Sequence, residues 1–218
     1  MSAAIVIGLL LGAGCRRDVR LTGQRIRHAT VRTVTDQGLE LGPLPADADA
    51  ARVEEEVKKV AYVLLRAIHD DVRADGDRIA REAALDREFA VIAPDRVYQY
   101  HLNPYDSRDE AIHKIVRLWA PTLAYYVASF DFDWPTAREQ MQVAISTGSS
   151  GAHVADRTVF IPLRDPQSPA AYIRARIDLT HENEYWRVWF VGFDPRQSAR
   201  RSTTVPAATA PAPAPRTG

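Results

Sequence analysis

The chain has 218 residues, which is enough for one domain of ordinary size with additional segments at its ends. Hydrophobic residues make up 46% and charged residues 26%, a composition typical of a globular protein rather than a disordered one. The 28 basic residues are balanced by 28 acidic ones, so little positive charge is left to neutralise phosphates and nucleic acid is not an expected partner. Cys15 is the only cysteine, which excludes an intrachain disulfide and a metal cluster built on cysteines.

An apolar run opens the chain. Residues 3–14 are apolar or small, and they are followed by Cys15 and two arginines. A helix that spans a membrane needs roughly 20 apolar residues, so this run suits the core of a signal peptide better. The segment Leu11-Gly12-Ala13-Gly14-Cys15 resembles the lipobox of bacterial lipoproteins, in which the cysteine receives the lipid and becomes the first mature residue. That resemblance implies a signal peptide over residues 1–14 and a domain anchored by lipid to the membrane, in the bacterial cell envelope and outside the cytoplasm. The alternative is an ordinary reduced cysteine beside an apolar N-terminal strand.

Residues 15–50 are interpreted as the lipidated cysteine and a tether. Residues 28–35 alternate enough to form a strand, residues 36–38 predict a turn, and residues 39–41 could pair back. A tether with some extended character explains the same pattern, and the sequence leaves both interpretations open.

Two helices are expected after residue 50. The first carries apolar residues at helical spacing on one face: Val53, Val57, Val60, Ala61, Leu64, Leu65 and Ile68. Polar residues 70–77 end it, and Asp77 is expected to be the N-cap of the second helix, which stops before Pro94. The inward-facing residues expected on the second helix are Ile79, Ala83, Leu85, Phe89 and Ile92.

The middle of the chain predicts a short strand over residues 97–102 and a third helix. Ser107 and Glu110 form a capping box at the start of this helix, which should end near Pro121. In residues 122–134 the aromatic residues Phe130, Phe132 and Trp134 alternate with polar ones. The latter part is therefore predicted to be a strand, while residues 123–127 could still be helical.

Strands dominate the rest of the chain. They are expected over residues 140–147 and 158–163, and Pro162 argues for an edge position of the second one. Residues 172–193 predict a hairpin with a four-residue turn at 181–184, in which Ile173 to Leu179 alternate with polar residues. Its second strand is apolar on both faces except at Arg187, which indicates the centre of a sheet. One face would carry Trp186, Val188 and Phe190, and the other Tyr185, Trp189, Val191 and Phe193. Residues 196–218 are rich in Ala and Pro and are expected to be a disordered tail.

This order of helix, helix, short strand, helix and several antiparallel strands resembles the NTF2-like superfamily. That is a cone-shaped α+β fold shared by small isomerases, dehydratases and many non-catalytic modules. The resemblance covers residues 51–195 and also depends on the polar segment 70–77 and the closing strand Glu184-Tyr185-Trp186-Arg187-Val188. It implies three N-terminal helices packed on a curved antiparallel sheet of four to six strands, with an apolar-lined mouth as the default ligand site.

Candidate chemistry is sparse. The 6 histidines show no spacing typical of metal ligands, so neither a metal nor a cofactor is expected. The NTF2-like resemblance would place Tyr98, Tyr100, His101, Asp131 and Asp133 near the mouth, where Asp131 or His101, helped by Tyr98, could move a proton. The alternative is that both aspartates simply face water, because they alternate with aromatic residues. The candidate pocket-lining residues, which could equally be core, are Tyr100, Trp119, Phe130, Phe132 and Trp189.

The leading hypothesis is therefore a lipid-anchored envelope protein whose NTF2-like domain binds a partner protein or a small apolar ligand without catalysis. The alternative is a small cofactor-free isomerase, dehydratase or hydrolase that uses Asp131 or His101. A third hypothesis is a structural spacer whose tail reaches toward the cell wall. Either a homodimer formed through the sheet or a ligand-filled pocket is also expected, because an apolar strand open to water invites aggregation.

Overall fold

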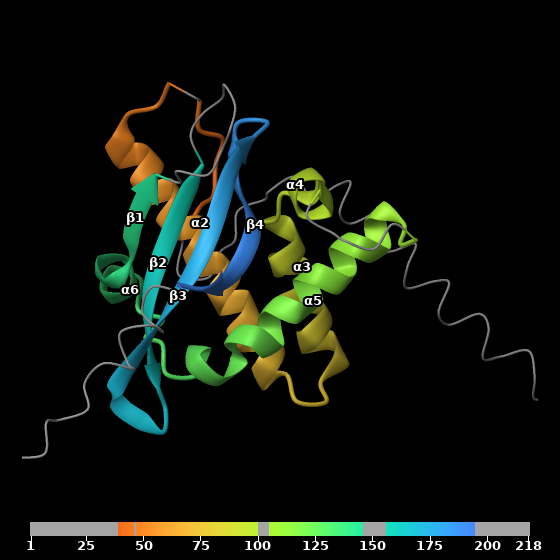
Figure 1. The fold of residues 1–218 in the computed structure, drawn as a ribbon, viewed down its shortest axis with the longest axis vertical. Helices are drawn as coiled ribbons and strands as arrows, with labels where there is room; N and C mark the ends of the chain where they lie inside the picture. Colours follow the sequence, from red (N-terminus) through yellow and green to blue (C-terminus); the bar gives the residue numbers. More distant parts are fainter. Residues whose placement is uncertain (1–38, 46, 100–104, 146–155, 195–218) are drawn as a thin grey trace, which may run out of the picture.

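The computed structural model describes residues 39–45, 47–99, 105–145 and 156–194. The lipidation candidate Cys15 and the site candidates Tyr100 and His101 lie outside these residues. The helices are α2 (Ala50–Arg73), α3 (Arg78–Ala90), α4 (Pro94–Gln99), α5 (Arg108–Val127) and α6 (Trp134–Gln140). The strands are β1 (Gln142–Ile145), β2 (Arg157–Asp165), β3 (Ser168–Glu182) and β4 (Tyr185–Phe193). They form one antiparallel sheet in the order β1-β2-β3-β4, so the fold is α+β as predicted (Figure 1).

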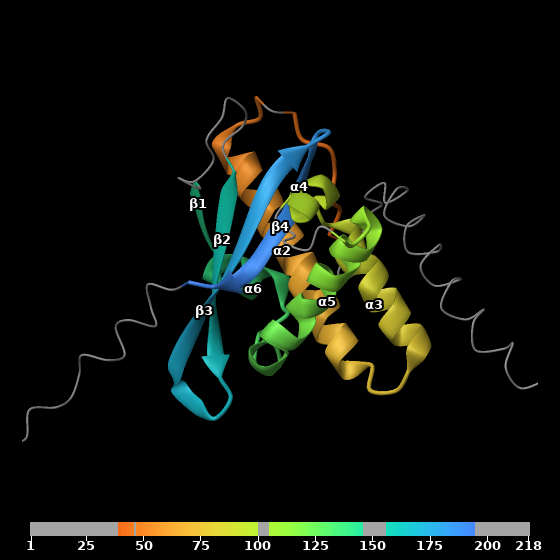
Figure 2. The same ribbon diagram turned by 45° about the vertical axis from the view of Figure 1, so that its right-hand side comes forward.

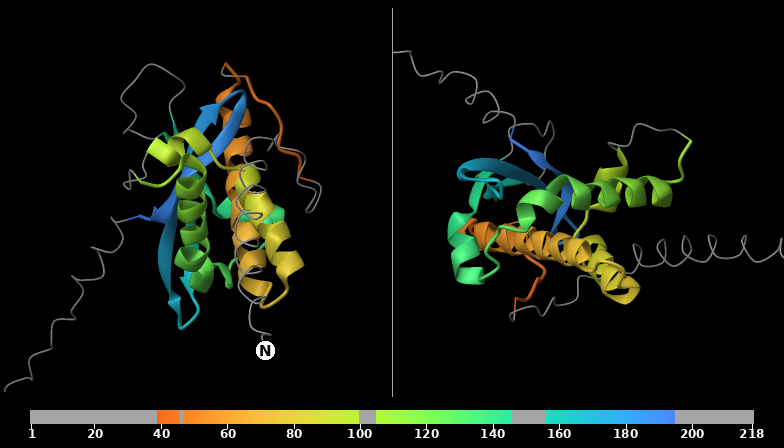
Figure 3. Two further views of the ribbon diagram at one scale, coloured as in Figure 1. Left: turned by 90° about the vertical axis from the view of Figure 1, so that its right-hand side faces the viewer. Right: turned by 90° about the horizontal axis from the view of Figure 1, so that it is seen from below.

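Helix α2 is the element on which the other layers pack. It lies against one face of the sheet and also contacts α3 and α5 (Figure 3). The predicted apolar stripe is confirmed, since Val57, Ala61, Leu64, Leu65 and Ile68 are all fully buried. Asp49 caps the helix by accepting a hydrogen bond from the backbone N–H of Arg52.

The segment before α2 belongs to the folded unit. Leu39, Leu41 and Leu44 are buried in the same core as α2. The backbone N–H of Leu44 donates to the carbonyl oxygen of Glu184 in the β3–β4 turn at 2.6 Å. Residues 39–45 are therefore held by both the core and the sheet, whereas residues 28–38 lie outside the described residues.

Helix α3 begins as predicted, and of the residues expected to face inward Leu85, Phe89 and Ile92 do pack on the core. The Asp77 carboxylate accepts from the backbone N–H groups of Ile79 and Ala80, which confirms the cap. Ile79, however, is 80% exposed and Ala83 is also exposed, so the prediction that they face inward is wrong. The buried residues of α3 are Ala84, Glu88 and Phe89.

Helix α5 begins with the predicted capping box of Ser107 and Glu110 but does not end near Pro121. It continues to Val127 because Leu123 and Val127 are buried in the core and Pro121 itself is exposed. A proline inside a helix removes one backbone hydrogen bond. Beside it the Thr122 hydroxyl donates to the Leu118 carbonyl oxygen, four residues earlier, at 2.6 Å.

Two short helices replace predicted strands. Helix α4 covers residues 97–99 of the segment expected as a strand over residues 97–102, and residues 100–102 are not described. Residues 128–133 have no regular structure, and α6 starts at Trp134 with Asp133 as its N-cap and a proline in its first turn. A proline early in a helix and an Asp cap favour a helix start over a strand, so the strand prediction for this segment is wrong.

The β3–β4 hairpin is confirmed, with a shorter turn than expected. His181 pairs with Trp186 and Glu182 with Tyr185, which leaves Asn183 and Glu184 as a two-residue turn. Both have positive φ angles, 51° and 68°. Two-residue turns with this backbone match the right-handed twist of the strands that they join.

Strand β4 differs from its predicted position and phase. It forms the end of the four-stranded sheet rather than its centre, although the backbone of Val188 bonds to Val91 and Ala93 and covers part of that edge. A bulge between the pairs Asp178–Phe190 and Leu179–Val188 leaves Trp189 unpaired. Beyond it the faces exchange, so Val191 is buried with Trp186 and Val188, while Phe190 is 39% exposed. The prediction that Phe190 shares their face is wrong.

Candidate functional site

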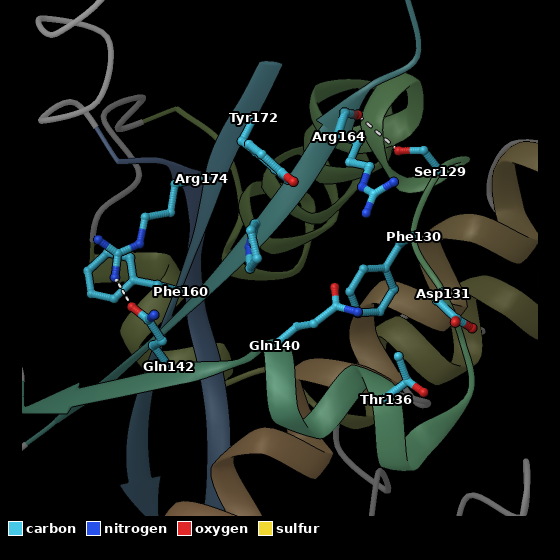
Figure 4. Close-up of a pocket in the computed structure, with 11 residues that line it drawn as sticks. Ser129, Phe130, Asp131, Thr136, Gln140, Gln142, Phe160, Arg164, Tyr172 and Arg174 are labelled. Atoms are coloured by element: carbon cyan, nitrogen blue, oxygen red, sulfur yellow. Dashed lines mark hydrogen bonds between the residues drawn. The ribbon is translucent and has the colours of Figure 1, made fainter. Parts of the chain in front are cut away.

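The candidate site lies beside the part of β2 that extends beyond its pairing with β1. The pairing of these strands runs only from Gln142–Phe160 to Ile145–Arg157, whereas β2 and β3 continue beyond it (Figure 2). The chain that precedes β1 is helix α6 instead of a longer strand. A pocket of about 880 Å³ fills the resulting space between β2, α6 and residues 129–131 (Figure 4). Its lining consists of Ser129, Phe130, Asp131, Thr136, Gln140, Gln142, Phe160, Pro162, Arg164, Tyr172 and Arg174.

The backbone of β2 at this edge is suited to having no neighbouring strand. Pro162 has no N–H to donate, and it lies past Phe160, the last residue of β2 that pairs with β1. The prediction that this strand lies at an edge of the sheet is wrong, because β2 lies between β1 and β3, but Pro162 itself lies in the part of β2 that β1 does not pair with. The Ser129 hydroxyl donates to the carbonyl oxygen of Arg164 at 2.9 Å, which satisfies another backbone group at this edge.

One arginine of the pocket is fixed in place. The guanidinium carbon of Arg174 lies 4.0 Å from the centroid of the Phe160 ring. Its Nη2 donates to Oε1 of Gln142 at 2.7 Å, and its Nη1 lies 3.4 Å from Oδ2 of Asp194. Ring, amide and carboxylate together hold this side chain against the wall of the pocket.

The second arginine is placed differently. Within the residues that the structure describes, the guanidinium group of Arg164 makes no hydrogen bond or ion pair. It points into the pocket from β2, and the hydroxyl group of Tyr172 faces it from β3 (Figure 4). The two residues are cross-strand partners in the β2–β3 ladder. The pocket thus holds a cationic group whose donors face open space.

The same face of the sheet carries a buried polar cluster next to the pocket. Asp178, expected on the solvent side of its strand, is only 1% exposed. Its carboxylate accepts from the Thr158 hydroxyl at 2.7 Å and from Nε of Arg176 at 2.9 Å. The bond to Asp178 raises the pKa of Arg176 above its ordinary value. Asp178 is therefore buried with its hydrogen-bond partners and not alone.

A glycine on β4 lets an aromatic ring cover the sheet beside this cluster. The Phe190 ring lies over Gly192, where an added Cβ would come within 2.8 Å of the ring. The ring also lies 5.6 Å from the guanidinium carbon of Arg176. Gly192 is needed for this close approach, because any other residue would push the ring away.

The proposed acid–base residues are not brought together. Asp131 is exposed at the rim of the pocket, and its carboxylate, turned away from the centre, accepts from the backbone N–H of Asp133 at 3.0 Å (Figure 4). Asp133 caps α6 by accepting from the N–H and hydroxyl groups of Thr136. Tyr98 is 40% exposed on α4, a helix that packs on α5 and β4 and not beside the pocket.

The residues expected to line the pocket are also not brought together. Phe130 lines the pocket, whereas Trp119 is 4% exposed in the hydrophobic core. Phe132 is half-buried against Tyr62 and His69, with ring centroids 5.9 Å and 4.8 Å away. Trp189 is half-buried at the bulge, with the guanidinium carbon of Arg96 5.5 Å from its ring.

Sequence reasoning missed the pocket residues of β2 and β3. Phe160, Pro162 and Arg164 alternate along one strand, and Tyr172 and Arg174 along the next, so each set shares a face. The available signal was Pro162, which marks an edge where a pocket can open. The unusual arginine content of the outer face, with Arg174 and Arg176 on one strand, was a second signal.

Two features are absent from residues 39–45, 47–99, 105–145 and 156–194. Across these residues no helix has both the length and the apolar character needed to cross a bilayer. The same residues contain no group of three or more His, Cys, Asp or Glu side chains arranged to hold a metal ion.

Comparison with known proteins identifies no family for this chain. No protein-family model matches it, and neither the curated proteins nor the solved structures searched contain a match.

Proposed function

We propose that the domain is a non-catalytic binding module that takes a small ligand, or a short segment of a partner protein, in the pocket beside β2. The observation that carries the proposal is the chemistry of the lining. Guanidinium, amide, hydroxyl and aromatic groups from β2, β3 and α6 converge there. The carboxylate of Asp131 is turned away and is bound to the backbone of Asp133. Such a lining recognises and orients a ligand, while a proton-transfer enzyme needs an acid or base directed at it.

The fold component of the proposal is an NTF2-like cone. Its support is the chain order, in which the long helices α2, α3 and α5 precede an antiparallel sheet that lies against α2. A mouth between sheet and helices is not where we place the ligand. Val159, Ile177 and Leu179 on the inner face of the sheet are fully buried in the core. The pocket at the edge of β2 is therefore the preferred site.

The ligand pocket is tested with the full chain and a panel of small compounds that have an aromatic body. Amide chemical shifts should change on β2 and β3 around Phe160, Arg164 and Tyr172. Tyr172→Ala should weaken these changes, because its ring is part of the lining. Tyr105→Ala is the control, since Tyr105 is 93% exposed and is not part of that lining. Chemical conversion of any compound, or shifts confined to another region, would contradict the proposal.

The second component of the proposal is the location of the domain in the cell. We place the domain at the bacterial cell envelope, tethered by lipid on Cys15, on the strength of the apolar run and the lipobox-like segment Leu11-Gly12-Ala13-Gly14-Cys15. Metabolic labelling with a fatty-acid analogue should mark the wild-type chain and not Cys15→Ser. Equal labelling of both, or labelling of neither, would exclude lipidation at this cysteine.

A further inference from the structure

The unpaired arginine of the pocket indicates the class of ligand. We infer that the pocket binds an organic carboxylate, an anion with an apolar or aromatic body whose carboxylate group pairs with Arg164. This inference rests on the proposed function, because it names the ligand chemistry of the same pocket.

The charge of the pocket supports an anion. Arg164 and Arg174 both line it, and Asp131 contributes the one carboxylate of that lining. Arg174 is already engaged by Gln142 and Asp194, and Asp131 points away from the centre. Arg164 alone directs an unengaged guanidinium group at the pocket, counted over the described residues. Guanidinium and carboxylate groups match as planar, two-point hydrogen-bonding partners, which favours a carboxylate over a spherical anion such as chloride.

The groups around Arg164 can complete such a site. The hydroxyl group of Tyr172 faces the guanidinium from the neighbouring strand, and the amide of Gln140 extends from α6 into the same space (Figure 4). Either can donate to a carboxylate oxygen that Arg164 also holds. One end of the ligand would therefore meet several donors without displacing any bond that the protein already makes.

The lining also includes three rings that can contact the body of the ligand, beside the polar residues Ser129, Thr136 and Gln142. The rings of Phe130, Phe160 and Pro162 form walls between the two arginines and α6. A volume of about 880 Å³ accommodates a small organic molecule. An inorganic anion would use Arg164 and leave these ring surfaces in water, so a carboxylate with an apolar body uses the pocket better.

Strand addition by a peptide is less favoured at this edge. A peptide that extended the sheet would need backbone donors and acceptors along β2. Pro162 offers no N–H, and the carbonyl oxygen of Arg164 already accepts from Ser129. The carboxylate therefore comes from a small molecule or from the C-terminus of a chain, and the experiment distinguishes these two sources.

The test measures binding of matched probes to the full chain by calorimetry and by amide chemical shifts. 4-Phenylbutyrate carries the carboxylate, and 4-phenylbutanamide replaces it by a neutral group of the same shape. The peptide acetyl-Ala-Ala-Ala-Phe, with a free or an amidated C-terminus, represents the chain terminus. Each probe is titrated into wild type, Arg164→Gln and Arg117→Gln. Arg117 is an exposed arginine of α5 outside the pocket, so its variant makes the same change of net charge.

We expect 4-phenylbutyrate to bind roughly tenfold to a hundredfold more tightly than the amide, as for hydrogen bonds to a charged group. Arg164→Gln should remove that difference, and Arg117→Gln should keep it. Tighter binding of the free peptide than of 4-phenylbutyrate would assign the carboxylate to a chain terminus, and the reverse would assign it to a small molecule.

Three results would overturn the inference, and they separate it from the proposed function. Equal affinity for acid and amide, with shifts on β2 and β3, excludes the carboxylate but leaves a binding pocket. Equal losses in Arg164→Gln and Arg117→Gln show an effect of net charge and not of the pocket. Absence of any shift around the pocket with every probe at millimolar concentration contradicts both the inference and the proposed function.

Discussion

Helices α2 and α3 pack against each other, but they differ in the kinds of residue that they bury. On α2 nearly every position that faces the interior is aliphatic or aromatic, from Val57 to Ile68. On α3 the most deeply buried positions are Ala84 and Glu88, both without exposed surface, while the isoleucine at position 79 lies in water. Helix α2 thus buries mainly apolar side chains, with the carboxylates of Glu56 and Asp71 near its two ends, whereas α3 buries a carboxyl group that has no hydrogen-bond partner among the described residues.

Burial of the Glu88 carboxyl group is the main unfavourable contribution to the packing of α3 on α2. Both of its carboxylate oxygens lack a hydrogen-bond partner among the described residues. Burial and the Asp71 carboxylate raise the pKa of Glu88 and Arg87 lowers it, with a net value of about 8. A carboxyl group that is neutral at physiological pH can remain in an apolar layer, but its ionisation there is unfavourable. Two adjacent helices can therefore differ in how their packing depends on pH.

The largest effect is expected on α2. Leu64 is fully buried under the sheet, so Leu64→Ala should lower the free energy of unfolding by about 2–5 kcal/mol. Glu55→Gln on the same helix should change it by less than about 0.5 kcal/mol, because its ion pair with Arg138 is partly exposed. Denaturant unfolding measures both, and comparable losses would mean that α2 is not held by its apolar stripe.

The second effect depends on pH and belongs to α3. The pKa of Glu88 in the folded chain, about 8, exceeds the ordinary value of 4.5, so the folded state binds the proton more tightly. The stabilisation is fully present below pH 4.5 and is lost as pH rises through about 8. Relative to Glu88→Gln, the wild type should therefore lose on the order of 5 kcal/mol at most across this window, at 1.36 kcal/mol per unit of pKa shift.

Unfolding curves at a series of pH values give this difference directly. Comparing the two proteins cancels the contributions of titrating groups that do not interact with Glu88. Glu82→Gln is the control, because Glu82 is exposed on the same helix. A difference between wild type and Glu88→Gln that does not vary with pH would show that Glu88 is not the buried titrating group.

Much of the fold could be predicted from the spacing of apolar residues, wherever the buried residues are also the apolar ones. The face of α2 and the inner face of β3, with Ala175, Ile177 and Leu179 fully buried, were predictable for that reason. The phase of α3 was not, because a hydrophobic pattern never assigns an interior position to a glutamate. The bulge at Trp189 was also hidden, since β4 is apolar on both sides and a period of two then fixes no phase.

The candidate site was predictable only in part, for a topological reason. Phe130 was named from its aromatic pattern, but Arg164 and Tyr172 were not. They face each other through the register of β2 and β3, and the space in front of them exists because α6 replaces an extension of β1. No single segment of sequence carries that information. Pro162 marked the edge without indicating what would lie beside it.

A third prediction tests the phase of α3 with adjacent alanines. Ala84 has no exposed surface and faces α2, so Ala84→Leu should overfill the interface and cost about 1–3 kcal/mol. Ala83 is exposed, and Ala83→Leu should leave stability within about 0.5 kcal/mol of wild type. The pair keeps the chemistry of the substitution constant, so unfolding measurements report orientation alone. The opposite order of effects would restore the inward face expected from the sequence.

The smallest effect is expected at the isoleucine that the hydrophobic pattern turns inward. Ile79 is 80% exposed in the first turn of α3. Ile79→Ser removes little buried surface, and the two residues have similar helix propensities, so stability should change by less than about 0.5 kcal/mol. Ile68→Ser on α2 is the matched comparison, because Ile68 is fully buried and its replacement leaves both a cavity and a buried hydroxyl. Chemical denaturation should find a large loss at position 68 and almost none at position 79. A loss of several kcal/mol at Ile79 would show that this end of α3 is covered in solution, and α3 would then be held by apolar burial in the same way as α2.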